Sequence, residues 1–245
     1  MKPITIALAA LTLLCSNLLL AQKVITDNNA NAQKRTLSGS FSAISVSSGV
    51  AAYLTEGNEE AVAVSAVDDE FRDRIVTEVK NGTLHIYYKQ DENKKWIKGD
   101  KRLKAYVSYK SLKNIRISSG ASVTSNEYIN ADKLNMDLSS GAKFNGSIKA
   151  QKATISQNSG AVATVSGNVQ QLDVSSSSGA KFNGKELQTI ACEASASSGG
   201  HVEVSCSESL NADASSGGKI AFNSNNNAIS VKKTKSSGGS IVNSK

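Results

Sequence analysis

A Ser-Gly pair that returns about every twenty residues constrains the fold of this chain more than any other feature. The seven pairs end at Gly120, Gly141, Gly160, Gly179, Gly199, Gly217 and Gly238. Successive glycines are 21, 19, 19, 20, 18 and 21 residues apart. A fixed period of this size is typical of stacked repeats, in which each unit packs only on its neighbours.

The residues around each glycine alternate between apolar and polar side chains. The third residue after the glycine is apolar in all seven repeats, as Val123, Phe144, Ala163, Phe182, Val202, Ile220 and Ile241. A period of two on both sides of a glycine predicts a strand, a tight arch and a second strand. Because such a unit buries its apolar side only by stacking, the sequence predicts an all-β fold, a right-handed parallel β-helix or β-solenoid.

An eighth Ser-Gly pair, which ends at Gly49, lies apart from the other seven. Between them lie alternating segments, a helical turn predicted at 68–74 and a hairpin predicted at Asn81-Gly82. We interpret this stretch as a β-rich excursion that could cover one end of the solenoid. The predicted organisation is an N-terminal β region at 37–110, with a first coil at 39–55 and the excursion at 55–110, and a repeat solenoid at 111–245.

The N-terminus has the features of an export signal. Lys2 provides a positive charge, residues 4–20 are mostly apolar, and Ala21 ends an acceptable cleavage site. We therefore assign residues 1–21 to a signal peptide and residues 22–36 to a flexible leader. Lipidation of Cys15 is the alternative. After cleavage no apolar run of spanning length remains, so we expect an exported protein, periplasmic, on the outer-membrane surface or extracellular, without an integral membrane segment.

Two groups of basic residues are candidate binding surfaces on a chain of net charge +7. The first is the charged loop at 89–104, with Lys94, Lys95, Trp96 and Lys98, which could bind sugar faces, an anionic polymer or a membrane surface, or could simply be a solvated hairpin loop. The second lies two residues after the glycines, where stacking would align Lys143, Lys181, His201 and Lys219. Such a stripe could attract acidic polysaccharide or lipopolysaccharide, or could serve solubility alone.

The two cysteines beyond the signal, Cys192 and Cys206, lie seven residues before and seven residues after Gly199. An arch at Gly199 would place them on facing strands at its open end. A disulfide there would close a 15-residue loop, a constraint that stabilises by roughly 3 kcal/mol on the loop-entropy model. The alternative is two buried free thiols that act as small hydrophobic side chains.

The order of the segments resembles a known family. FSAISVSSGVAAYLTEG is followed by VAVSAVDDEFRDRIVTEVKNGTLHIYY and then by the Ser-Gly repeats. This order resembles the DUF2807 family, the head GIN domain of autotransporter adhesins, over roughly residues 37–245. The resemblance implies a right-handed parallel β-helix-like fold in exported proteins, mostly from Bacteroidetes. It brings no catalytic residues.

These observations together favour a binding protein over an enzyme. No serine, histidine and aspartate order with a recognisable local motif is present, and the serines are explained by the arches. We expect no cofactor, no bound metal and no nucleic-acid partner. The leading hypothesis is a surface or periplasmic adhesion or glycan-binding module. The alternatives are a structural protein of the cell envelope that associates with other envelope proteins, and a polysaccharide-active enzyme that uses Asp173 and Glu193.

Overall fold

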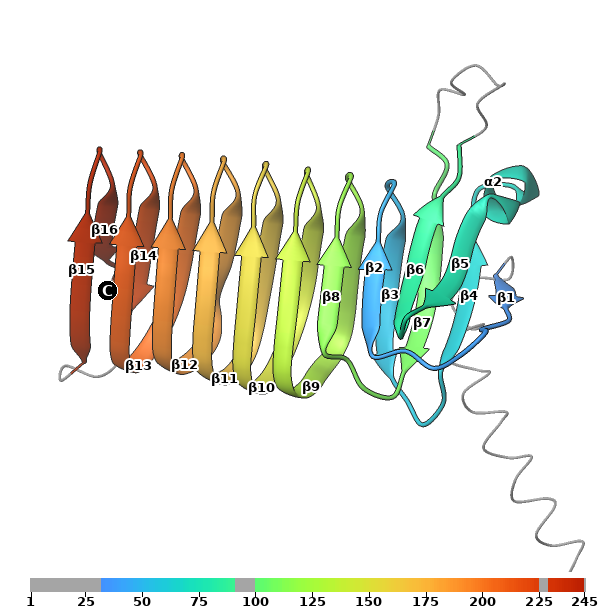
Figure 1. Ribbon diagram of the computed structural model, residues 1–245, viewed down its shortest axis with the longest axis horizontal. Helices are drawn as coiled ribbons and strands as arrows, with labels where there is room; N and C mark the ends of the chain where they lie inside the picture. The colour runs from blue at the N-terminus through green and yellow to red at the C-terminus, as the bar shows by residue number, and fades with distance from the viewer. Residues whose placement is uncertain (1–31, 91–99, 225–228, 245) are drawn as a thin grey trace, which may run out of the picture.

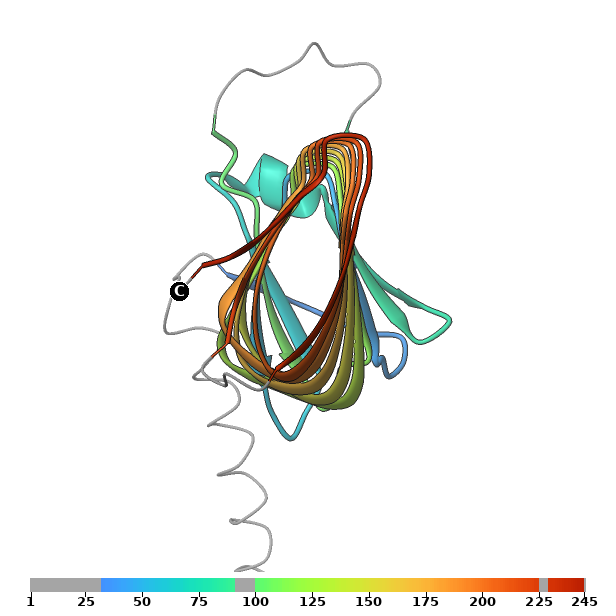
Figure 2. The ribbon, with the colours of Figure 1, turned by 90° about the vertical axis from the view of Figure 1, so that its left-hand side faces the viewer.

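The protein is a β-solenoid, described here by a computed structural model that covers residues 32–90, 100–224 and 229–244. The strands form one 16-stranded sheet that winds around a narrow apolar core (Figures 1 and 2). The all-β solenoid with a spacing of about 20 residues, predicted from the Ser-Gly period, is confirmed. The predicted signal peptide, residues 1–21, lies outside the described residues.

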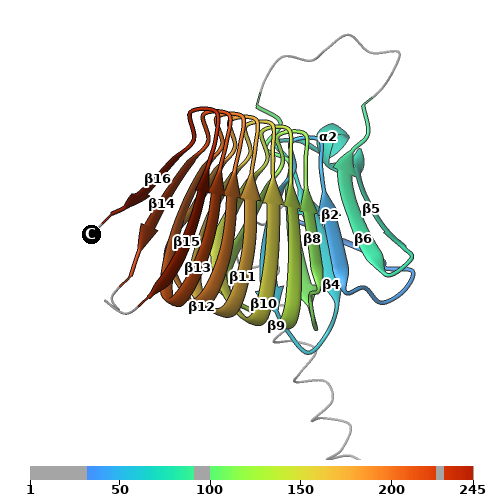
Figure 3. The same ribbon diagram turned by 60° about the vertical axis from the view of Figure 1, so that its left-hand side comes forward.

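Five long strands build the centre of the stack: β9 (Ser122–Leu138), β10 (Lys143–Gln157), β11 (Val162–Ser176), β12 (Lys181–Ala196) and β13 (His201–Ala214). Each strand descends from one Ser-Gly arch, bends at the opposite edge and rises to the next arch (Figures 1 and 3). We call the side formed by the first halves the post-arch face and the side formed by the second halves the pre-arch face. Neighbouring strands are parallel, with Phe144 beside Ala163 and Ala163 beside Phe182.

The arches explain the Ser-Gly pairs. At all eight arches the serine has φ between 48° and 58° and the glycine φ between 70° and 78°. Two successive left-handed residues make a type I′ turn, closed for example by Ala121 N–H donating to Ser118 O at 3.1 Å. Each glycine N–H of the first seven arches also donates to the serine carbonyl of the next arch, as Gly141 N does to Ser159 O at 3.0 Å. This ladder offsets the roughly 1–2 kcal/mol that a left-handed serine costs.

The core alternates large and small residues from coil to coil. Phe144 and Phe182 are almost fully buried, and Ala163 lies between them in the stack. Each phenylalanine ring lies next to the glycine two residues later, so that a Cβ on Gly184 would be 2.4 Å from Phe182 Cε1. The sequence AKFNG occurs twice, at 142–146 and 180–184. In each copy the phenylalanine supplies the buried ring, and the glycine, which lacks a Cβ, leaves room for it.

The excursion contributes a coil of its own, which the sequence did not reveal. The first coil consists of β2 (Ala43–Val46) and β3 (Ala51–Glu56), and the excursion supplies β6 (Thr83–Tyr88) and β7 (Lys104–Tyr109). β2 lies between β6 and β8 (Asn114–Ile117), and β3 lies between β7 and β9, all in parallel. The first coil in the sequence is thus the second coil in space. The predicted helical turn is present as α2 (Asp69–Asp73), and the predicted hairpin joins β5 (Ile75–Lys80) to β6.

Antiparallel strands and a short helix close this end of the stack. β4 (Ala61–Ser65) pairs with β7, β1 (Gln33–Arg35) pairs with β4, and β5 (Ile75–Lys80) pairs with β6. Helix α2 (Asp69–Asp73) is capped by Asp68 Oδ1, which accepts from Phe71 N at 3.0 Å, and Phe71 packs on the core.

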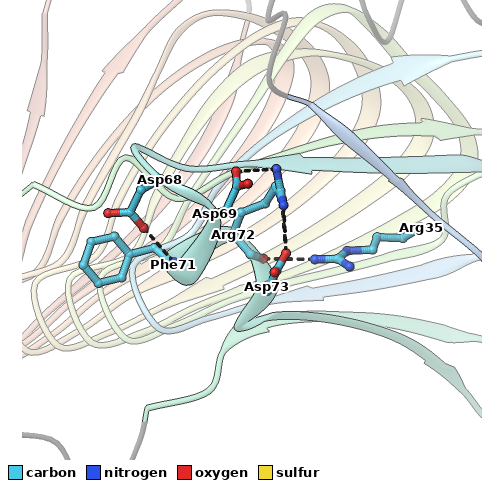
Figure 4. Close-up of polar contacts among 6 residues, drawn as sticks. All are labelled: Arg35, Asp68, Asp69, Phe71, Arg72 and Asp73. Carbon is cyan, nitrogen blue, oxygen red and sulfur yellow. Dashed lines mark hydrogen bonds and ion pairs between the residues drawn. The ribbon is translucent and has the colours of Figure 1, made fainter.

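Residues 33–35 are therefore not part of a flexible leader, as residues 22–36 were predicted to be. They form β1, and Arg35 Nη2 donates to Arg72 O at 3.0 Å (Figure 4).

At the other end of the stack, no further described strand pairs with the outermost strands. The last strands are β14 (Lys219–Asn223), β15 (Ser230–Lys235) and β16 (Ser240–Asn243), of which β15 pairs with β13 and β16 with β14. Lys233 crosses this end, with Nζ 4.8 Å from the centre of the Phe222 ring. Lysine on an edge strand disfavours pairing with another chain, because its charge would have to be desolvated.

Candidate binding surfaces

The strand register aligns the predicted basic stripe on the post-arch face. Lys143 pairs with Val162, Val162 with Lys181, Lys181 with His201, and His201 with Lys219. The three lysines are exposed and His201 is half-buried. Because neighbouring strands are roughly 4.8 Å apart, Lys181, His201 and Lys219 lie within about 10 Å of one another along the column. We call Lys143, Lys181, His201 and Lys219 the basic column.

Sequence reasoning missed residues that continue this face. Lys104 pairs with Ala51 and Ala51 with Ser122, so Lys104 occupies the same column three coils before Lys143. Two residues further along these strands, the rings of Tyr53 and Tyr106 stack with centroids 5.5 Å apart and an interplanar angle of 17°. Aligning residues 104–109 with residues 51–56 would have found them, because both segments alternate in the same phase.

Most of the charged loop lies outside the residues that the structure describes. Lys94, Lys95, Trp96 and Lys98 fall outside the described residues. The segment that contains them joins β6 to β7, in the place where the other coils have a Ser-Gly arch. The binding role of these residues therefore stays a prediction.

A groove that the sequence analysis did not predict follows the bend between the two faces. Its volume is about 730 Å³, and it is lined by three successive residues from each of four coils and by Ser207. The three rows are Asn130, Lys149, Asn168 and Gln188; Ala131, Ala150, Val169 and Thr189; Asp132, Gln151, Gln170 and Ile190. We call this feature the axial groove.

The acidic pair considered for catalysis lies on the pre-arch face. Asp173 pairs directly with Glu193 in the register, as expected for neighbouring coils. Both line a smaller hollow of about 370 Å³, together with Lys152 and Lys232. In the part of the chain that the structure describes, no group of three or more His, Cys, Asp or Glu residues could hold a metal ion.

Cys192 and Cys206 are free thiols in the structure, and both are buried. They belong to neighbouring strands, β12 and β13, near the bend. Cys206 Sγ donates to Ser209 O at 2.9 Å and to Ile190 O at 3.3 Å. Burial raises the pKa of the Cys192 thiol well above its usual range, because the thiolate would lose its hydration.

We expect Cys192 to react with iodoacetamide in the unfolded chain and to be protected in the native chain. The thiolate is the nucleophile, and burial suppresses both its formation and its access. Peptide mass spectrometry after labelling at pH 8, with and without urea, measures the difference. Labelling of native Cys192 at the unfolded rate would contradict the buried thiol, and a thiol that stays unlabelled in urea without reductant would reveal a disulfide.

Comparison with known proteins assigns the family. Residues 40–226 match the DUF2807 family, described as "Putative auto-transporter adhesin, head GIN domain". The chain belongs to the DUF2807 family. The family resemblance inferred from the sequence is thereby confirmed. No functionally curated protein matches this GIN-domain chain. Among the described residues no helix is long and apolar enough to cross a bilayer.

Solved structures share the fold of this GIN-domain protein at low sequence identity. A "putative adhesin" from Bacteroides fragilis is 18% identical, with a TM-score of 0.75, over 87% of this chain and 96% of that one. A second, from Parabacteroides distasonis, is 17% identical with a TM-score of 0.68 over the same shares. A "Putative lipid binding protein" from the same species is 19% identical, with a TM-score of 0.61, over 89% and 98%.

Proposed function

We propose that this GIN-domain protein is an exported adhesion module that binds anionic polysaccharide through its basic column. The observation that carries the proposal is the register of the post-arch face, which stacks Lys181, His201 and Lys219 on consecutive coils. Positive groups at a regular spacing on a rigid sheet match a polymer that carries regularly spaced carboxylates or phosphates. Membership of an adhesin family supports an exported, surface-associated protein.

Binding without chemical turnover is the role that we infer. The basic column contains no carboxylate in register with it, and a charged, exposed column needs no buried acid or base to hold an anion. Incubation with polygalacturonate, followed by chromatography of the products, tests this inference. Chain shortening that disappears in Asp173→Asn or Glu193→Gln variants would instead establish a polysaccharide-active enzyme.

We expect the Lys181→Gln/Lys219→Gln variant to bind polygalacturonate about tenfold more weakly than the wild type, since each exposed charge pair contributes up to ~1 kcal/mol. Wild-type affinity should also fall when the salt concentration rises, because the column is exposed to screening ions. Calorimetric titration at low and moderate salt, repeated with lipopolysaccharide, measures both effects.

The control is Lys133→Gln/Lys152→Gln, which removes the same charge from two exposed lysines that pair with each other outside the basic column. Affinity that falls equally in both variants would show a response to net charge alone. Failure of the wild type to bind either polymer at low salt, together with cross-links to other envelope proteins, would favour the structural alternative.

A further inference from the structure

The axial groove is formed by equivalent positions of successive repeats and not by a single loop. Four successive coils contribute the same three positions, and the register pairs Asn130 with Lys149, Lys149 with Asn168, and Asn168 with Gln188. The middle row pairs in the same way, from Ala131 through Ala150 and Val169 to Thr189. The groove therefore runs parallel to the solenoid axis and presents the same three strand positions at each coil, about every 4.8 Å.

Amide side chains dominate the two edges of the groove. Gln151, Asn168, Gln170 and Gln188 are all exposed. In the described part of the chain, no hydrogen bond engages the side-chain amides of these four residues. Asn130 is different, because its Nδ2 donates to Glu56 Oε2 at 2.7 Å. A primary amide both donates and accepts, as does a sugar hydroxyl, so these edges match a ligand rich in hydroxyl groups.

The floor of the groove carries no charged side chain. The middle row between the amides is turned toward the core, with Ala150 7% and Val169 3% exposed, whereas Ile190 is 42% exposed at one edge. One base, Lys149, and one acid, Asp132, are the ionised residues of the lining, so its formal charge is zero. The exposed Ile190 side chain and the methylene groups of the exposed glutamines suit the C–H faces of pyranose rings, whose hydroxyls project at the ring edges.

Other occupants fit these residues less well. A peptide that added a strand would need an unpaired sheet edge, whereas the strands that line the groove pair with neighbours in the stack. An acyl chain would cover the amides of the two outer rows and leave them without hydrogen-bond partners, which costs free energy for each group. An acidic polymer has no net positive charge to meet here, unlike on the basic column.

We propose that the axial groove binds one strand of an uncharged, linear, extended polysaccharide, aligned with the solenoid axis. One pyranose unit of an extended chain has a length close to the coil spacing of roughly 4.8 Å, so successive sugars lie opposite successive coils. This site is separate from the basic column and takes a different class of ligand. The proposal therefore does not depend on the function proposed above.

Titration calorimetry with cellohexaose, xylohexaose and mannohexaose tests the proposal on the full chain. We expect at least one of the three to bind, with an affinity that rises from the disaccharide to the tetrasaccharide and then levels off. Salt should change this affinity little, because the groove and the ligand carry no net charge. No binding of any of these sugars at millimolar concentration, or an affinity independent of chain length, would overturn the proposal.

Two variants then locate the site. Asn168→Ala/Gln188→Ala removes exposed amides from two adjacent coils and should weaken binding of the hexasaccharide about tenfold, because the hydrogen bonds of both amides to the sugar are lost. Lys181→Gln/Lys219→Gln, on the basic column, should leave that affinity unchanged. Circular dichroism melting curves check that both variants are folded. Unchanged affinity in the amide variant, or equal loss in the two variants, would place the sugar elsewhere and overturn the assignment.

Discussion

Replacing Gly167 by alanine is expected to lower the free energy of unfolding by about 3 kcal/mol or more. Gly167 lies in the bend of β11 with φ +109°, a conformation that residues with a Cβ rarely adopt. An alanine Cβ would also lie 2.1 Å from Ile148 O, an atom of the neighbouring coil that belongs to the sheet. The backbone would have to shift in two coils at once. Urea unfolding followed by circular dichroism measures the loss.

The control for Gly167 is Gly160→Ala at an arch. Gly160 has φ +70°, and a Cβ there would meet nothing within 4 Å. The expected cost is therefore only the ~1–2 kcal/mol of a left-handed alanine. Equal losses for Gly160→Ala and Gly167→Ala would contradict the contact with Ile148. Because repeat proteins can unfold in segments, the melting midpoints should be compared along with the free energies.

Phe182→Ala is expected to destabilise the chain by about 3–5 kcal/mol, the usual cost of removing a buried aromatic ring and leaving a cavity. Phe182 is fully buried, and its stack neighbours are Ala163 and Val202. Neither neighbour is large enough to fill the space. The exposed neighbour in the sequence gives a matched control, since Lys181→Ala should change the free energy of unfolding by less than ~0.5 kcal/mol.

A double variant distinguishes the ring from its surroundings. Gly184→Ala alone places a Cβ 2.4 Å from Phe182 Cε1 and should destabilise the protein. In the Phe182→Ala background the ring is gone, so the same change should cost less. The difference is a coupling energy, which for residues in contact is typically ~0.5–3 kcal/mol. Additive losses would show that the ring and Gly184 do not share the space.

The parts of the fold that the sequence predicts are those that local chemistry determines. A type I′ turn needs two left-handed residues, so the glycines mark the arches directly. The excursion's coil carries no such mark, because a longer segment replaces its arch between β6 and β7. Its place beside the first coil depends on long-range pairing, such as Ile44 with Leu84, which a periodic pattern does not reveal.

The sequence analysis did not predict the axial groove, because the number of residues between the arch glycine and the bend differs from coil to coil. Counted from the preceding glycine, Lys149 is the eighth residue, whereas Asn130 is the tenth and Gln188 the ninth. The register shifts between Asn145 and Ser147 and between Thr164 and Gly167 absorb these differences. Counted back from the following glycine, all four residues of that row lie eleven positions away. Alignment of the repeats on the following glycine, instead of the preceding one, therefore predicts this row from the sequence.

The position of β2 and β3 in the stack has a consequence for how the chain is made. Both strands are synthesised before either of their neighbours, because β6, β7 and β8 all lie later in the sequence. The first coil has no partner strand until β6 is available and no second neighbour until residue 117, and closing those long loops costs entropy. From β9 onward each coil can instead dock on its predecessor as it emerges. The solenoid can therefore gain or lose coils at its C-terminal end during evolution, whereas its N-terminal end is a closed unit that must assemble as a whole.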